Sequence, residues 1–238
     1  MKPLLILKAG NAIAGLPAGW GDFEDWIVAA VALPEVQWRC CDVSAGEELP
    51  LHETVAGVIV TGSAAMVTDR LPWSERAAAW LAQAVAHELP TLGICYGHQL
   101  LAHALGGEVG YHPAGREMGT KQIHALAAAA TDPLFGALPA TYPAHVTHSQ
   151  TVLQPPPGAA ILAANSFELH HALRFGPRAW GVQYHPEFTA PIMDKYLELR
   201  SRNLAEEGQD VARLRREVQP TPQAQTLLQR FAGQTHAQ

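Results

Sequence analysis

The feature that most constrains the fold is a glycine-flanked cysteine between an apolar run and a helix-like run. Residues 89–94 read L-P-T-L-G-I, residues 93–97 read G-I-C-Y-G, and residues 98–105 carry apolar side chains at helical spacing. A strand, a nucleophile between small residues and a helix form the sharp elbow that exposes a reactive side chain above a sheet. Such a turn is strained and leaves room only for small neighbours. The pattern predicts that Cys95 is a nucleophile at a helix N-terminus, where the helix dipole stabilises negative charge.

An isolated G-x-C-x-G motif fits a buried cysteine in a strand-to-helix turn equally well. A second segment, residues 181–188 (G-V-Q-Y-H-P-E-F), favours the nucleophile. Residues 179–184 are typical of a buried strand, and the following proline keeps the backbone extended. His185 and Glu187 are two positions apart, so their side chains leave an extended backbone on the same face. This places an orienting carboxylate beside a base, as a cysteine nucleophile requires. Taken alone, the segment fits a core histidine and a helix-capping acid.

Together the two motifs resemble those of the class I glutamine amidotransferases, the triad-type glutaminases, over roughly residues 2–200. The similarity is nearest to the glutaminase domain of GMP synthetase and its stand-alone relatives. By this resemblance Cys95 is the nucleophile, His185 is the base and Glu187 orients the base. The resemblance also implies that the substrate is glutamine or another γ-glutamyl small molecule and that no cofactor takes part.

Residues 60–65 (V-T-G-S-A-A) follow an apolar strand and resemble the oxyanion loop of the same family. Gly62 has no side chain to block its backbone N–H, and the N–H of Tyr96 directly follows the nucleophile. These two donors are therefore the expected oxyanion hole. The alternative for Gly62 is an ordinary turn at the end of a strand.

The substrate-binding residues expected from the resemblance are Gln99, His148, Ser149 and Gln150. The Gln99 amide offers both a donor and an acceptor, which suits a zwitterionic amino acid, and an exposed glutamine at a helix start is the equal alternative. The GMP synthetase branch commonly has Gly-Asp where this chain has Ser149-Gln150. Residues 116–119 (R-E-M-G) match a further family loop near the pocket, or form a solvated charged turn.

Strand-like and helix-like segments alternate through the first half of the chain. We expect strands at residues 4–8, 36–42, 57–61 and 91–94, and helices at 23–33 and 74–87. This order predicts an α/β, flavodoxin-like three-layer sandwich with a central, mostly parallel sheet and ligands at the carboxyl ends of its strands. The less regular residues 108–185 are expected to add antiparallel strands. The expected division is an amidotransferase domain at 1–200 and a C-terminal helical tail at 201–238.

Composition fits a compact enzyme: 48% of the 238 residues are hydrophobic and 16% are charged. A net charge of −6 gives no general attraction to nucleic acid. The three cysteines form no disulfide framework and fit a reducing compartment. The first apolar run is too short for a signal peptide and no stretch is long enough for a membrane span, so we expect a cytoplasmic protein. The histidines lack metal-ligand spacing, so no metal site is expected.

Three functions remain open at this level. The favoured one is a glutaminase that hydrolyses the γ-amide of glutamine through a cysteine γ-glutamyl thioester and passes ammonia to a separate synthetase subunit. The synthetase is expected to be a separate subunit because the tail after residue 200 is too short for an ATP-using domain and the sequence lacks a G-x-x-x-x-G-K-[ST] phosphate loop. The second is a stand-alone γ-glutamyl hydrolase or peptidase. The third is a noncatalytic binding module of the same fold, which the intact Cys95, His185 and Glu187 disfavour.

Overall fold

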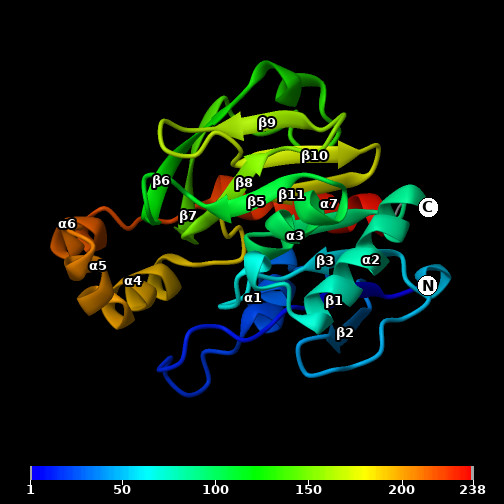
Figure 1. Cartoon of the computed structure of the whole chain (residues 1–238), viewed down its shortest axis with the longest axis horizontal. Helices are drawn as coiled ribbons and strands as arrows, with labels where there is room; N and C mark the ends of the chain where they lie inside the picture. The colour runs from blue at the N-terminus through cyan, green and yellow to red at the C-terminus, as the bar shows by residue number, and fades with distance from the viewer. Residues whose placement is uncertain (1, 237–238) are drawn as a thin grey trace.

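The computed structural model describes residues 2–236, whose central sheet has nine strands in the order β2-β1-β3-β4-β11-β10-β9-β6-β7 (Figure 1). Neighbouring strands are parallel from β2 to β11 and antiparallel from β11 to β7. The parallel strands are β2 (Trp38–Asp42), β1 (Leu4–Lys8), β3 (Gly57–Val60), β4 (Thr91–Ile94) and β11 (Ala179–Val182). The antiparallel strands are β10 (Ala172–Gly176), β9 (Ala160–Ala164), β6 (Glu117–Ala125) and β7 (Thr141–His148). A separate antiparallel ribbon pairs β5 (Glu108–Tyr111) with β8 (Gln150–Gln154).

Seven α-helices and three short 3-10 helices complete the described residues. The α-helices are α1 (Phe23–Val31), α2 (Pro72–Ala86), α3 (Tyr96–Ala104), α4 (Ala190–Leu199), α5 (Ser201–Glu206), α6 (Val211–Arg216) and α7 (Pro222–His236). The 3-10 helices are η1 (His52–Thr54), η2 (Val67–Asp69) and η3 (Ala127–Thr131). Among these residues no helix is long and apolar enough to cross a membrane.

Alternation along β1 divides the core between the two faces of the sheet. Leu4 and Ile6 pack with α1 and α7 on one face, whereas Leu5 and Leu7 pack with α2 and α3 on the other. Successive side chains of a strand point to opposite faces, so an unbroken apolar run is buried on both sides. The predicted α/β three-layer fold with added antiparallel strands is confirmed.

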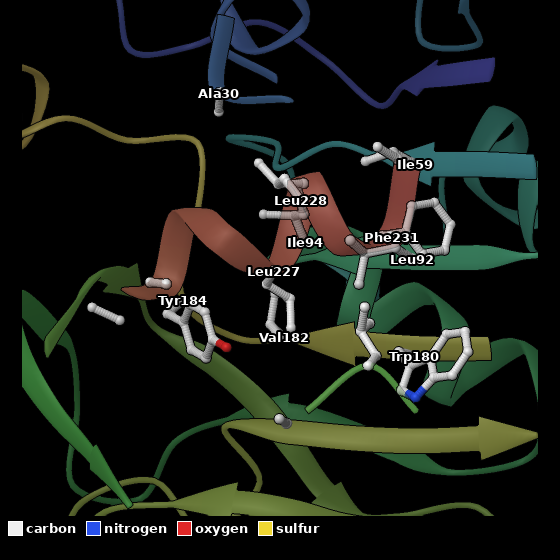
Figure 2. Packing of buried hydrophobic residues seen from close by; sticks show 14 of the residues in the cluster. Ala30, Ile59, Leu92, Ile94, Trp180, Val182, Tyr184, Leu227, Leu228 and Phe231 are labelled. Carbon is white, nitrogen blue, oxygen red and sulfur yellow. The ribbon is translucent and has the colours of Figure 1, made fainter. Parts of the chain in front are cut away.

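The last helix, α7, is part of this core although the sequence suggested a tail. Figure 2 shows Leu227, Leu228 and Phe231 of α7 beside Ile94 of β4 and Trp180 of β11. Proline at its first turn suits a helix start, because the first N–H groups have no intrahelical acceptor. Helices α4, α5 and α6 group instead beside β6, at one side of the molecule (Figure 1).

Two local capping signals fix the starts of helices α1 and α4. Asp22 caps α1 by accepting from the N–H of Phe23, while the Asp25 carboxylate accepts from the N–H of Asp22, a reciprocal capping box. Thr189 caps α4 through the N–H of Ile192. The α1 cap thereby places Phe23 beside Gly62, just after β3, and beside His185, just after β11.

Candidate active site

Cys95 joins β4 to α3 at a strained turn. Its backbone has φ 50° and ψ −99°, which a non-glycine residue rarely adopts. A Cβ on Gly93 would lie 2.4 Å from the backbone of Gly97, and a Cβ on Gly97 would lie 2.6 Å from the carbonyl oxygen of Val60. Both glycines are therefore required by close backbone approach. The Cys95 N–H donates to the carbonyl of Val182 at 2.8 Å, which anchors the elbow to β11.

His185 lies at the end of β11 with its ring fixed by Glu187. The His185 Nδ1–H donates to Glu187 Oε1 at 2.7 Å, and both side chains are almost fully buried. Within residues 2–236, Nε2 of His185 is buried without a hydrogen-bond partner. Cys95 and His185 line the same cavity of about 40 Å³. Cys95 and His185 thus share one small cavity, and Glu187 holds the His185 ring through Nδ1.

Charge controls the protonation of His185. Burial opposes a charged ring, but the negative charge of Glu187 and then the interaction with Cys95 outweigh it and raise the pKa of His185 to about 10. At neutral pH the ring is therefore an imidazolium. An imidazolium held beside a sulfur at a helix N-terminus stabilises negative charge there and supplies a proton to a leaving group.

Aromatic packing and a glycine hold the His185 ring in place. Phe188 stacks on it with ring centroids 4.2 Å apart, and Phe23 lies on the same stack at 5.9 Å. A Cβ on Gly62 would lie only 2.9 Å from His185 Cε1, so a side chain at this position would displace the ring. Gly62 lines neither small cavity beside Cys95, whereas the next residue, Ser63, lines both. The oxyanion role of Gly62 stays a prediction.

Tyr96 starts α3 directly after the elbow. As the first residue of the helix, it has no intrahelical acceptor for its N–H. Its hydroxyl is bonded to Ser74 Oγ at 2.6 Å inside the core, which anchors the first turn. Tyr96 lines a second cavity, of about 120 Å³, together with Cys95. Its N–H as an oxyanion donor also stays a prediction.

The four residues predicted to bind substrate all line this second cavity, namely Gln99, His148, Ser149 and Gln150. Gln99 is buried, and its Nε2 donates to the Gln150 carbonyl at 2.7 Å and to Gln183 Oε1 at 2.9 Å. Both amide hydrogens are used within the protein, so only the side-chain oxygen of Gln99 is left for a ligand. Ser149 Oγ and Gln150 Oε1 are buried without a hydrogen-bond partner among the described residues. Their binding role remains a prediction.

A buried acid behind the cavity was not found from the sequence. His148 donates from Nδ1 to the Gln150 carbonyl at 3.0 Å and from Nε2 to Glu117 Oε2 at 3.1 Å. Asn165 donates to the other Glu117 oxygen at 2.7 Å, and His171 Nε2 lies 3.3 Å from Oε2. Burial favours the neutral acid, but the hydrogen bond from His148 and the close approach of the His171 ring outweigh burial and lower the pKa of Glu117. The R-E-M-G motif includes Glu117 but did not predict its role as a buried hydrogen-bond acceptor for His148.

Two arginines also reach the cavity of about 120 Å³. Arg116 belongs to the R-E-M-G motif and forms an ion pair with Glu207 at 3.1 Å. Arg200 lies between α4 and α5, where no sequence motif marked it. It lines the smaller cavity as well, so it borders the space on both sides of Cys95.

The remaining titratable groups give no sign of a metal centre in the part of the chain that the structure describes. There, no cluster of three His, Cys, Asp or Glu side chains is arranged to hold a metal ion. Cys40, Cys41 and Cys95 are all free thiols, with Cys40 exposed and the other two buried. Although Cys40 is exposed, partial desolvation of its thiol by the surrounding chain raises its pKa to about 11, with a further contribution from the charge of Glu24. Cys40 is therefore a poor nucleophile at neutral pH.

Comparison with known proteins gives the family. The model of the class I glutamine amidotransferases matches residues 23–200. The glutamine-hydrolyzing GMP synthase of Aeropyrum pernix is 35% identical over 159 residues, which are 65% of this chain and 29% of that protein. The chain thus spans less than one third of the length of this relative.

A glutamine amidotransferase from Thermotoga maritima superposes with a TM-score of 0.79 at 20% identity, covering 100% of both chains. One from Methylobacillus flagellatus has a TM-score of 0.76 at 23% identity, covering 98% of this chain and 92% of the other. With the family model spanning most of the chain, the protein belongs to the class I glutamine amidotransferase family.

Proposed function

We propose that this protein is a glutaminase that hydrolyses the γ-amide of glutamine through a thioester on Cys95 and delivers the ammonia to a separate synthetase. The observation that carries the proposal is the arrangement around one cavity of a cysteine on a strained elbow and an imidazolium fixed by Glu187. A base and its orienting carboxylate beside a cysteine are the components of covalent amide hydrolysis.

The reaction would proceed in two halves. In the first, the Cys95 sulfur attacks the γ-carbonyl carbon, and the N–H groups of Tyr96 and Gly62 hold the oxyanion. The His185 imidazolium then donates its Nε2 proton to the departing nitrogen, so the C–N bond breaks and ammonia leaves. In the second half, neutral His185 takes a proton from water, and the resulting hydroxide attacks the thioester. The C–S bond breaks, glutamate is released and the sulfur and imidazolium are restored. Glu187 holds the ring throughout and is a positioning residue.

The destination of the ammonia is inferred from the relatives. The matching segment of the Aeropyrum pernix protein is part of a longer chain that is named a glutamine-hydrolyzing GMP synthase. A protein that supplies ammonia in this way would act with a synthetase chain as its partner. The small volume of the cavity, about 120 Å³, supports a small substrate such as glutamine, because pockets for larger ligands measure about 300–1,000 Å³.

A second candidate function, hydrolysis of a larger γ-glutamyl amide or peptide, is favoured by one specific observation. A cavity of about 990 Å³ adjoins the small one and shares Arg116 and Ser149 with it. The stacked rings of His112 and Phe167, with centroids 4.2 Å apart, form part of its wall. This space would accommodate an amine substituent that glutamine lacks.

Steady-state assays of the purified protein separate the two candidates. We expect slow hydrolysis of free glutamine that rises when a cognate synthetase is added, and loss of this activity in Cys95→Ala. Fast partner-free cleavage of a γ-glutamyl peptide with negligible release of ammonia from glutamine would overturn the first proposal in favour of the second. Absence of turnover on every γ-glutamyl compound, with or without a partner, would contradict both.

A further inference from the structure

Arg200 lines the two small cavities that Cys95 also lines. The residue ends α4 and precedes α5, and its N–H donates to the carbonyl of Tyr196 at 3.0 Å, which fixes the backbone at this junction (Figure 1). Its side chain is half-buried and lines both cavities that meet at Cys95. Neither of the two sequence motifs accounts for it, and the hydrolytic steps described above do not use it.

The charge of Arg200 is left without a dedicated partner. Within residues 2–236 it forms no ion pair, and its Nε is buried without a hydrogen-bond partner. Glu207 contributes a favourable charge, but its carboxylate is already bonded to the neighbouring Arg116 at 3.1 Å. Burial and the repulsion from Arg116 lower the pKa of Arg200. A buried N–H donor or a positive charge without a partner raises the free energy of the protein. An anionic ligand at Arg200 would supply the missing partner.

We propose that Arg200 binds the α-carboxylate of the γ-glutamyl substrate and thereby makes the site specific for that group. This inference rests on the proposed function, and it holds for both candidates because glutamine and γ-glutamyl amides share the same α-carboxylate. With the γ-carbonyl at Cys95, the α-carboxylate is the anionic group of the substrate and lies a few bonds away in the same cavity. The planar guanidinium offers paired N–H donors that match a carboxylate.

Oxygen acceptors for the α-ammonium group of the substrate line the same cavity. Gln150 Oε1 and Ser149 Oγ are buried, unpartnered and border the same cavity as Arg200. The side-chain oxygen of Gln99 is also left over after its amide hydrogens are used. A zwitterion with its carboxylate at Arg200 and its ammonium toward these oxygens would satisfy groups that otherwise stay unpaired.

The direct test compares glutamine with glutamine α-amide, in which the α-carboxylate is replaced by a neutral carboxamide. Wild-type protein should prefer glutamine, and Arg200→Met should raise KM for glutamine about tenfold to a hundredfold while kcat changes little, as expected for a lost charge-assisted contact. The variant should lose its preference between the two substrates. Arg202→Met is the matched control, because the Arg202 side chain is 90% exposed and pairs with Glu206. An equal loss on both substrates, or a normal KM for glutamine, would overturn the proposal.

A second measurement does not depend on turnover. Cys95 is alkylated with iodoacetate, which is anionic, and with iodoacetamide, which is neutral, and the Cys95 peptide is quantified by mass spectrometry. Arg200→Met should lower the ratio of the iodoacetate rate to the iodoacetamide rate about tenfold, and Arg200→Lys should lower it less. If the ratio falls while no γ-glutamyl compound is hydrolysed, the proposed function fails and the anion site stands. If the ratio of the two alkylation rates is unchanged in Arg200→Met, the proposed anion site is refuted. If Arg200→Met does not fold, Arg200→Gln replaces it in the same test.

Discussion

In the parallel half of the sheet, Cys95 follows β4 at a close backbone approach, and His185 follows β11 and is held by ring packing and one hydrogen bond to Glu187. In the antiparallel half, the cavity wall is held by a set of buried polar contacts. The elbow depends on two glycines that no other residue can replace. The wall depends on Glu117, whose oxygens accept from His148 and Asn165. Under the proposed function, the reacting groups and the wall that contacts the substrate would therefore belong to different halves of the sheet. Changes in the first half should therefore act on kcat, and changes in the second on KM.

The largest effect is expected for Cys95→Ala. Loss of the nucleophile should lower kcat/KM by about 10⁴-fold or more, because no other group can form the thioester. Thermal unfolding should stay close to wild type, since the substitution removes a single sulfur at a position where the core cluster borders a cavity. Cys40→Ser is the control and should retain full activity, because Cys40 is an exposed thiol with a raised pKa. Equal activity of Cys95→Ala and wild type would refute the assignment of Cys95 as the nucleophile.

Glu187→Gln should come next, with kcat lowered about 10³-fold and KM little changed. Glu187 helps to raise the pKa of His185 to about 10, and activity that needs the imidazolium is lost as pH rises through that pKa. Without the negative charge the pKa falls, so the basic limb of the kcat/KM profile should move to lower pH. Exposed Glu206→Gln is the control. A variant with kcat intact and KM strongly raised would make Glu187 a substrate contact instead.

Phe231→Ala tests whether α7 belongs to the parallel half of the core. This side chain is fully buried against Trp180, with ring centroids 6.4 Å apart. Its removal should lower the free energy of unfolding by about 3–5 kcal/mol, the usual cost of a large cavity. Denaturant titration measures this, and kcat of the folded fraction should be unchanged. Gln223→Ala, at an exposed position of the same helix, should cost little. A similar small cost for Phe231→Ala would show that α7 packs loosely.

The smallest effect is expected for Glu117→Gln in the antiparallel half. The amide can still accept one hydrogen bond but loses the charge beside His148 and His171, so the free energy of unfolding should fall by about 1–3 kcal/mol. The wall carrying Ser149 and Gln150 should loosen, raising KM for glutamine about tenfold with kcat almost constant. Glu108→Gln, on an exposed position of β5, is the control. A large loss of kcat at constant KM would break the division between the two halves.

The same division explains what could be predicted from the sequence. Strands β1, β3, β4 and β11 of the parallel half are short, fully buried runs. The elbow and the His185-Pro186-Glu187 segment are local, so their structure follows from nearest neighbours in the chain. Glu117 and His148 come together only through the antiparallel register that pairs them across β6 and β7. Arg200 lies at a helix end with no periodic pattern to distinguish it from a surface arginine. The catalytic and binding roles of all these residues stay predictions until the variants are measured.

The packing of α7 has a consequence for how the protein is made. During translation β1 emerges before α7, yet Leu4 and Ile6 of β1 share a hydrophobic cluster with Leu227, Leu228 and Phe231 of α7. A ribosome-bound chain that still lacks α7 leaves this apolar face partly uncovered and open to aggregation. This side of the core can be completed only after the apolar residues of α7 have left the ribosomal exit tunnel. A nascent-chain series arrested before and after α7 should therefore differ sharply in protease resistance.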